Sequence, residues 1–456
     1  MIRKFDYEKV PIVNVINEII VDAVKRNASD IHFDPQTENL KVRIRIDGVL
    51  MDYTIVPNTL KKNLITRVKI IASMNITETR LPQDGAIKTI LEGLNLDLRV
   101  SSLPTSEGEK VVIRILDYSL SLKGLENLGF STKNFEKLKK MISIPDGIIL
   151  VTGATGTGKS TTVYSILQKL NTEDKNLITV EDPIEMDIEG INQVKVNSSI
   201  GLDFAFVLRS VLRQDPNIIM IGEIRDTETA KIAVRASITG HLVLSTIHTN
   251  NSLSTIERLL DMEVERYLLA TALSGIVSQK LARRLCPKCR KLRPTNEYEK
   301  KIFKQVLGQE VNEVYSAGSC DDCGFGYKGR IAIHEVLVIN QRIRDQISEG
   351  VKRDDLRKLV YNSDVTTLLQ DGLEKVWNGL TTFEEVLKLI ELDEENSNES
   401  REYNLNQALS DSSYRTQNSK IILPKRNPII EDPLNKSKEK VQESIPELNN
   451  IKEIIK

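Results

Sequence analysis

The stretch at residues 153–160, GATGTGKS, constrains the fold of this chain more than any other segment. It has the spacing G-x-x-x-x-G-K-S, it follows the apolar run GIILVT, and a helical stretch comes after it. In the order strand, glycine-rich loop and helix, this pattern binds nucleotide phosphates, because the glycines let successive backbone N–H groups point at the phosphate oxygens. We therefore predict an α/β core built around a phosphate loop. A glycine-rich turn that binds no nucleotide is the alternative.

The phosphate loop supplies the predicted nucleotide-binding residues. We expect Lys159 to reach the β and γ phosphates and the Ser160 hydroxyl to ligate Mg²⁺. The full predicted set is Gly153, Ala154, Thr155, Gly156, Thr157, Gly158, Lys159, Ser160 and Thr161.

Two acidic motifs and one histidine follow other apolar strands. LITVEDPIE places Glu181 directly after a strand, and NIIMIGEIRD does the same for Glu223. Catalytic groups of open α/β sheets gather at the carboxyl ends of the strands, so both acids can face the phosphates. Either acid alone could instead be a helix cap. His248 ends the strand HLVLSTIHTN, although a lone histidine is more often a satisfied polar residue than a catalyst.

Apolar patterning divides the chain into segments. From Gly147, short apolar strands alternate with helical stretches, which predicts a parallel sheet covered on both faces. An amphipathic helix over 11–25 and an alternating strand over 41–48 predict a small α/β domain before it. The predicted divisions are an N-terminal α/β domain (1–118), a linker and helix (119–140), the phosphate-loop core (141–283), a cysteine module (284–330), a C-terminal helical region (331–393) and a disordered tail (394–456).

Composition argues against several classes of protein. Among 456 residues the formal net charge is -1, so no global field attracts the molecule to nucleic acid or anionic lipid. Its apolar runs are shorter than the roughly 18 residues of a membrane span, and its first residues lack the apolar core of a signal peptide. We expect a cytoplasmic protein that meets the membrane through partners.

All four cysteines fall in two Cys-x-x-Cys pairs, namely Cys286, Cys289, Cys320 and Cys323. A tetrahedral zinc ion needs four thiolates, and a two-residue spacer lets one tight turn present two sulfurs to the same ion. A redox dithiol or two disulfides would suit a thioredoxin-like context or a secreted chain, and neither context is present. We predict structural zinc, with a short helix between the two pairs.

Taken together, these motifs resemble the secretion ATPases of the type II secretion and type IV pilus assembly class (GspE/PilB-like). The resemblance covers about residues 10–392. Its matching motifs include the phosphate loop, the aspartate box at 178–185, the second acidic motif at 215–226 and the histidine box at 239–250. It implies a RecA-like P-loop NTPase core, a smaller PAS-like N-terminal α/β domain, a zinc-bound tetracysteine module and C-terminal helices.

The resemblance also implies roles for single residues. Glu181 is similar to the water-activating acid, Glu223 to the acid that holds Mg²⁺ through water, and His248 to the γ-phosphate sensor. Arg99 and Arg114, on strands of the first domain, resemble the arginines that reach across to the phosphates. A mobile cation of this kind stabilises charge that spreads over the γ-phosphoryl oxygens in the transition state.

The implied activity is ATP hydrolysis with ATP, Mg²⁺ and Zn²⁺ by a cytoplasmic hexamer, peripheral at the inner face of the cell membrane. Its implied partners are a polytopic inner-membrane platform protein and, indirectly, pilin or pseudopilin. The family also has a cytoplasmic membrane-associated adaptor that docks on an additional N-terminal domain. Because this chain starts almost at the second domain, the resemblance leaves that contact open.

Alternatives of the same class are a pilus retraction ATPase, which usually lacks the four cysteines, and a DNA-uptake or conjugation-type secretion ATPase. A zinc-containing nucleic-acid-binding protein is a remote alternative from another class, suggested by the basic stretch ARRLCPKCRKLRP. No aromatic residues are interleaved in that stretch, and we expect no direct contact with nucleic acid.

Overall fold

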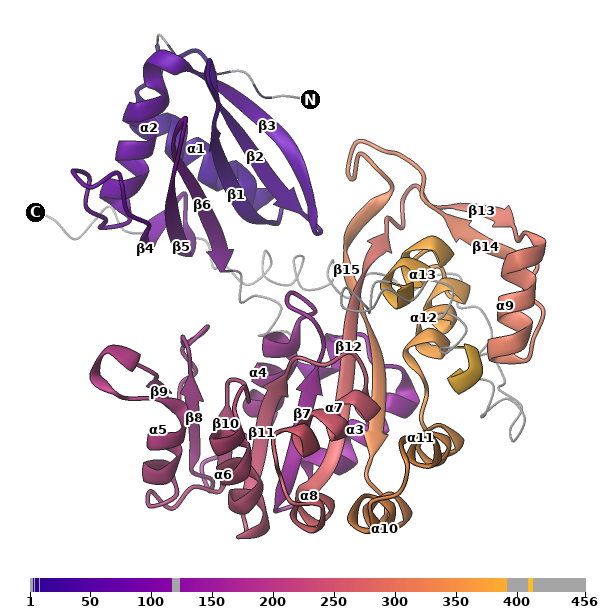
Figure 1. Cartoon of the computed structure of the whole chain (residues 1–456). Coiled ribbons are helices and arrows are strands. Elements are labelled where there is room, and N and C mark those ends of the chain that lie inside the picture. The colour runs from indigo at the N-terminus through magenta and orange to yellow at the C-terminus, as the bar shows by residue number, and fades with distance from the viewer. Residues whose placement is uncertain (1–2, 4, 8, 117–123, 392–408, 413–456) are drawn as a thin grey trace, which may run out of the picture.

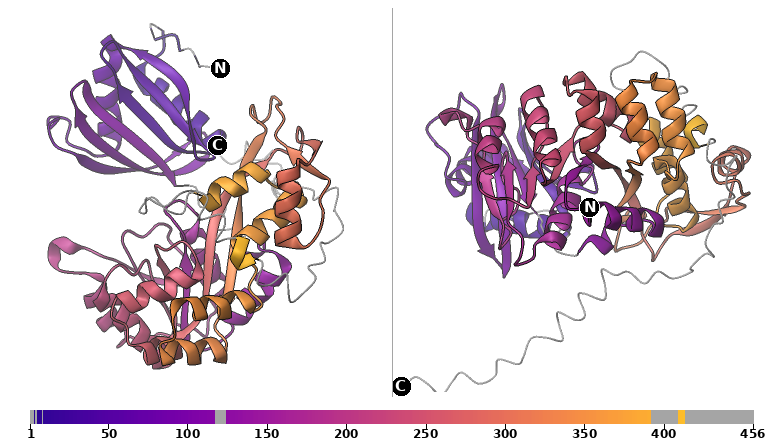
Figure 2. Two further views of the ribbon diagram at one scale, coloured as in Figure 1. Left: turned by 45° about the vertical axis from the view of Figure 1, so that its right-hand side comes forward. Right: turned by 90° about the horizontal axis from the view of Figure 1, so that it is seen from below.

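The computed structural model of the chain describes all residues except 1–2, 4, 8, 117–123, 392–408 and 413–456 (Figure 1). Its described part contains a six-stranded sheet in the first domain, a seven-stranded sheet in the core and a two-stranded sheet in the cysteine module. The first domain lies at one end of the core sheet, as Figures 1 and 2 both show.

The first domain is an antiparallel sheet of order β3-β2-β1-β6-β5-β4 with two helices packed on one face. The amphipathic segment predicted at 11–25 forms α1, and the strand predicted at 41–48 belongs to β2, so both predictions are confirmed. The elements are α1 (Ile12–Lys25), β1 (Ala28–Pro35), β2 (Asn39–Ile46), β3 (Val49–Pro57), α2 (Asn58–Ile71), β4 (Gln83–Leu91), β5 (Leu94–Thr105) and β6 (Gly108–Leu116).

Alternation along these strands separates an apolar face from a polar one, since successive side chains of a strand point to opposite faces. Leu98 and Ile113 are fully buried under α1 and α2. Their chain neighbours Arg99 and Arg114 therefore emerge on the other face, where they are paired directly across β5 and β6. This pairing puts both predicted arginines on one polar surface.

The core sheet has the order β15-β12-β7-β11-β10-β8-β9, parallel throughout except for β15, which runs antiparallel to β12. Its strands are β7 (Gly147–Thr152), β8 (Leu177–Glu181), β9 (Asn192–Lys195), β10 (Ile218–Ile221), β11 (Leu242–Ile247), β12 (Leu273–Leu285) and β15 (Tyr327–Val338). Its helices are α3 (Thr132–Ile142), α4 (Lys159–Leu170), α5 (Phe204–Val211), α6 (Thr227–Ile238), α7 (Ser252–Asp261) and α8 (Arg266–Ala272), with two short 3₁₀ turns, η2 (Leu125–Asn127) and η3 (Ser198–Ile200).

Helices cover both faces of this sheet, which explains why its strands are continuous apolar runs. Ile148 and Leu150 of β7 pack with α5 to α8, whereas Ile149 and Val151 pack with α3 and α4 on the opposite face. The predicted parallel sheet with helices on both faces is confirmed.

The cysteine module is inserted between β12 and β15. It contains β13 (Lys291–Pro294), α9 (Glu297–Leu307) and β14 (Glu313–Ser316), so the short helix expected between the cysteine pairs is present. Asn296 and Glu299 form a reciprocal capping box that fixes the start of α9. The helices α10 (Gln341–Glu349), α11 (Arg353–Asn362), α12 (Leu368–Trp377) and α13 (Phe383–Glu391) follow β15.

β15 crosses the expected division at residue 330 because it pairs with β12 along its whole length, and the domain boundaries themselves stay predictions. Most of the segment predicted as a disordered tail, 394–456, lies outside the described residues. The exception is 409–412, a short helical piece in which Leu409, Asp411 and Ser412 are buried. Among the described residues no helix is both long and apolar enough to cross a membrane.

Candidate active site

The phosphate loop connects β7 to α4, as the motif predicted. Gly156 and Gly158 adopt φ values of 79° and 85°, which favour glycine because they lie in the left-handed region. A Cβ at Gly153 would stand 2.4 Å from the carbonyl oxygen of Gln279, so the backbone passes close to β12 at this point. The loop thus has the tight curvature that directs backbone N–H groups at an anion.

Gln279 of β12 holds the phosphate loop in place through its side-chain amide, a role that we did not predict from the sequence. Its Nε2 donates to the Thr157 carbonyl oxygen at 2.6 Å, and its Oε1 accepts from Thr162 Oγ1 at 2.7 Å. The side chain is 3% exposed. A glutamine inside the apolar strand GIVSQKL was the available signal, because a buried amide needs partners.

Lys159 is buried at the start of α4, where its Nζ donates to the carbonyl oxygens of Gly153 at 2.8 Å and Ala154 at 3.0 Å. Burial lowers the pKa of its ammonium group to about 8, and the nearby Glu223 carboxylate opposes that shift. Because the Lys159 ammonium group is held by carbonyl oxygens of the loop itself, it lies where it can turn to the phosphate oxygens of a bound nucleotide. Ser160 follows it in the first turn of α4 and is exposed.

Glu223 and His248 meet at the carboxyl ends of β10 and β11. His248 Nε2 lies 3.4 Å from Glu223 Oε2, and Arg225 Nη2 donates to Glu223 Oε1 at 2.5 Å. Burial lowers the pKa of His248, and the positive charge of Lys159 lowers it further. Lys159, Glu223 and His248 therefore share one electrostatic environment.

Glu223 Oε2 is also suited to a metal site. It is buried and accepts no hydrogen bond of normal geometry from the described residues. A buried carboxylate oxygen whose contact with His248 Nε2 is as long as 3.4 Å fits an acceptor for a metal-bound water.

Glu181 ends β8, and its carboxylate lies against Tyr164 of α4. Its carboxylate is 3% exposed and accepts hydrogen bonds from three side chains: Tyr164, Thr179 (Oγ1, 2.5 Å) and Gln193 (Nε2, 3.1 Å). Burial and the Glu181 carboxylate together raise the pKa of Tyr164. The structure thus brings Glu223 and His248 to Lys159 and gives Glu181 a separate set of partners.

The two predicted arginines lie on β5 and β6 and contact residues outside the phosphate loop. Arg99 Nη2 donates to the Ile184 carbonyl oxygen at 2.9 Å and lies 3.1 Å from Glu185 Oε2, so it holds the segment that follows Glu181. Arg114 Nε donates to Asp30 Oδ1 at 3.1 Å within its own domain. Their expected reach to the phosphates stays a prediction.

The four cysteine sulfurs converge in the connection between the end of β12 and the start of β15, all within 4.8 Å of one another. Cys289 and Cys320 each lie 3.4 Å from Cys323, and Cys286 lies 3.8 Å from Cys320, so no disulfide links them. Zn–S bonds of about 2.3 Å in a tetrahedron place the sulfurs about 3.8 Å apart. The four side chains fit one zinc ion, and the two-disulfide alternative does not apply.

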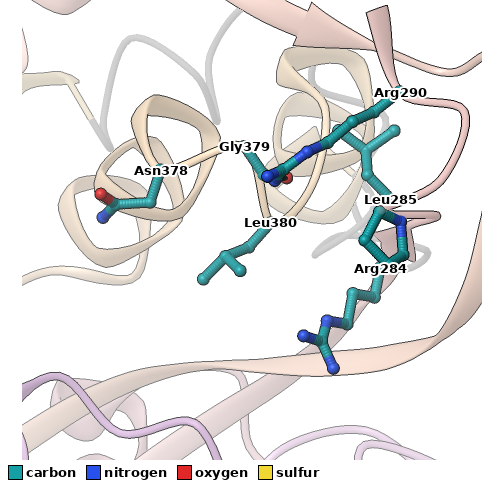
Figure 3. A pocket seen from close by; sticks show the side chains of 7 residues that line it. Arg284, Leu285, Arg290, Asn378, Gly379 and Leu380 are labelled. Atoms are coloured by element: carbon teal, nitrogen blue, oxygen red, sulfur yellow. Dashed lines mark hydrogen bonds between the residues drawn. The ribbon is translucent and has the colours of Figure 1, made fainter. Parts of the chain in front are cut away.

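A small pocket opens beside the cysteines, between the end of β12 and the turn from α12 to α13 (Figure 3). Arg290 and Gly379 face each other there, and Arg290 Nη1 donates to the Gly379 carbonyl oxygen at 2.7 Å. Its lining includes no residue of the phosphate loop. This contact ties the first cysteine pair to the C-terminal helices.

A family model described as "Type II/IV secretion system protein" matches residues 6–388, which is most of the chain. The chain belongs to this family. A putative type II secretion system protein E of Escherichia coli (strain K12) is 45% identical over 380 residues, covering 83% of this chain and 77% of that protein. The type IV pilus assembly ATPase PilB of Thermus thermophilus is 45% identical over 374 residues, covering 82% of this chain and 42% of PilB.

Solved structures agree with the family. The pilus retraction motor PilT, crystallised with ADP, is 26% identical with a TM-score of 0.57 over 85% of this chain and 98% of its own. The ATPase DotB of Yersinia pseudotuberculosis, at 22% identity and a TM-score of 0.62 over 85% of this chain and 97% of its own, supports the fold alone. The expected fold class and the resemblance to the secretion ATPases are confirmed.

Proposed function

We propose that this protein is a cytoplasmic, hexameric motor ATPase that powers assembly of a type IV pilus or a type II secretion pseudopilus. The observation that carries the proposal is the meeting of Lys159, Glu223 and His248 at one edge of the core sheet. Membership of a family whose relatives include secretion and pilus assembly ATPases supports the same activity.

Each residue of the site has a task in this proposal. Bound MgATP would supply the γ-phosphoryl group and a divalent positive charge. The loop N–H groups and Lys159 hold the phosphates, and Ser160 and Glu223 provide the oxygens for Mg²⁺ and its water. Glu181 orients and deprotonates the attacking water, and His248 senses the γ-phosphate from its position beside Glu223.

Arg99 and Arg114 connect the chemistry to motion. They lie on the polar face of the first domain, so they contribute to the phosphate site only when that domain closes on the core. ATP then favours the closed arrangement and its hydrolysis products favour it less, because a ligand shifts an equilibrium by its difference in affinity for the two states. Each cycle would move one domain relative to the other.

The mechanical output acts at the inner face of the cell membrane. In a hexamer with heterologous interfaces, the strokes of successive subunits follow one another around a closed ring. The ring turns or lifts a polytopic platform protein, which moves pilin or pseudopilin into the filament, and an adaptor is a further partner. The four cysteines would hold a zinc ion, and that ion would fix the module between β12 and β15 in place.

ATP turnover tests the enzymatic part. Lys159→Ala is expected to abolish hydrolysis, because the phosphates lose their buried ammonium partner. Lys169→Ala removes an exposed lysine from the same helix and is the matched control. Undiminished turnover by purified Lys159→Ala protein would refute the proposed site.

The direction of the motor is tested in cells. Pilus retraction is the second candidate, because the retraction motor PilT is among the similar structures. Deletion of the gene followed by imaging of the cell surface separates the two. Lost filaments indicate assembly, excess filaments indicate retraction, and lost DNA uptake with normal surface filaments indicates an uptake fibre.

A further inference from the structure

A continuous chain of hydrogen bonds runs from the first domain to the Glu181 carboxylate. It begins at Arg99 on β5, which holds the Ile184 carbonyl oxygen and the Glu185 carboxylate. It continues from the backbone N–H of Glu185 to the Tyr164 hydroxyl, and from that hydroxyl to Glu181. Tyr164 lies on α4, the helix that begins with Lys159.

The Tyr164 hydroxyl links the Glu185 backbone to the Glu181 carboxylate in this hydrogen-bond chain. Backbone N–H can only donate, so the hydroxyl accepts from Glu185 N at 3.1 Å. An ionised carboxylate can only accept, so the same hydroxyl donates its single proton to Glu181 Oε2. Tyr164 is 2% exposed and packs in the apolar cluster between α3, α4 and the sheet, which leaves its ring little freedom.

We propose that Tyr164 is a positioning residue that couples the contact between Arg99 and residues 184–185 to the orientation of the Glu181 carboxylate. When the first domain moves, Arg99 displaces the backbone at Glu185, and the hydroxyl transmits that displacement to the carboxylate. This inference rests on the proposed function, because it assumes that Glu181 acts on the attacking water.

Three side chains donate to the Glu181 carboxylate. They are Tyr164 from α4, Gln193 from β9 and Thr179 from β8 itself. Of these three, only Tyr164 titrates, and burial raises its pKa above the ordinary value, so the hydroxyl keeps its proton. Thr179 and Gln193 both donate to Oε1, whereas Tyr164 donates to Oε2, so loss of the hydroxyl frees Oε2 from the donor that orients it.

Tyr164→Phe is the direct test, because it removes the hydroxyl and keeps the ring. We expect kcat to fall about tenfold while KM for ATP stays within about twofold, because phosphate contacts are untouched. A residue with a merely structural role would lower the melting temperature without this split between kcat and KM.

A pair of variants tests the link to the first domain. Glu185→Gln removes the charge that Arg99 contacts and keeps the backbone N–H that reaches Tyr164. We expect it to lower kcat several-fold alone and to have no further effect in a Tyr164→Phe background. Asp187→Asn is the control, since it removes a nearby contact with Lys88 at 4.0 Å that does not reach Tyr164.

Native kcat in Tyr164→Phe overturns the proposal. Glu185 and Tyr164 effects that simply multiply also overturn it. If Tyr164→Phe does not fold, 3-fluorotyrosine at 164 replaces it, and an unchanged kcat with this stronger donor overturns the proposal. If turnover of the native protein does not depend on Lys159, the proposed function itself fails, which the Lys159→Ala variant distinguishes.

Discussion

Lys159 is a buried ammonium group whose charge state follows its surroundings. Its pKa, lowered to about 8 by burial, lies below the ordinary value of a lysine. Phosphate oxygens favour the charged form, so ATP binding raises this pKa again.

We therefore expect the protein to take up about half a proton per ATP bound at pH 8, where Lys159 is half-protonated beforehand. Titration calorimetry in two buffers with different ionisation enthalpies measures this uptake. His248 contributes little at this pH, because its own pKa is lowered below the ordinary value. Lys159→Arg should bind without uptake, and a native binding heat that does not depend on the buffer would contradict the prediction.

Residue-level prediction from sequence works where the partners are close together in the chain. The phosphate loop is one continuous segment, so its spacing alone identifies Lys159 and Ser160. Gln279 and Tyr164 were missed because their partners come from other segments: Gln279 bonds Thr162, 117 residues away. Nothing local distinguishes such a contact from ordinary core packing.

The stability of the cysteine module is expected to depend on bound zinc, because the apolar core of the module is small. Cys286→Ser is expected to lower the melting temperature by about 5 °C or more and to reduce zinc content, while turnover per folded molecule stays near native. Ser319→Ala, next to Cys320, is the control, since it removes a single hydrogen bond to the Gly324 carbonyl oxygen and no thiolate. Unchanged melting temperature and metal content would refute a structural zinc ion.

The piece at 409–412 packs on α11 and α12 through specific polar contacts. Arg357 makes a bidentate ion pair with Asp411, with N–O distances of 2.8 and 2.9 Å, and the two side chains are 18% and 9% exposed. Thr367 Oγ1, which caps α12, also lies 2.9 Å from Ser412 Oγ.

We expect Asp411→Asn to destabilise the protein by about 2 kcal/mol, because the largely buried Arg357 guanidinium loses the negative charge of its partner. Urea unfolding measures this loss. Asp355→Asn removes an exposed partner of Lys358 on the same helix and should change stability by less than about 0.5 kcal/mol. Equal effects of the two substitutions would mean that 409–412 does not contribute to stability.

Element types follow from local periodicity, whereas partners of the elements do not. The apolar spacing of residues 11–25 predicts α1, and the apolar run before the phosphate loop predicts β7. The pairing of β15 with β12 could not be predicted, because about 40 residues separate the two strands and register is set by the whole sheet. For the same reason the sequence did not show that Arg99 contacts residues 184–185.

At the scale of the whole molecule, polar contacts between described residues join the first domain to the core. They include Arg99 with Ile184 and Glu185, Lys88 with Asp187, and the Asp47 carboxylate with the Gly329 N–H at 2.9 Å. Interfaces of this polar kind between domains of one chain are typical of domains that move relative to each other. The proposed motor requires such a movement.

The central claim is that splitting of bound ATP changes the placement of the first domain on the core. Single-molecule energy transfer between dyes on non-natural amino acids at Lys62 and Glu173, both exposed, measures it directly. We expect distinct distances with ATP and with ADP, and a single distance in Lys159→Ala protein under both conditions. One unchanging distance in the native protein, whichever nucleotide is present, would contradict the account.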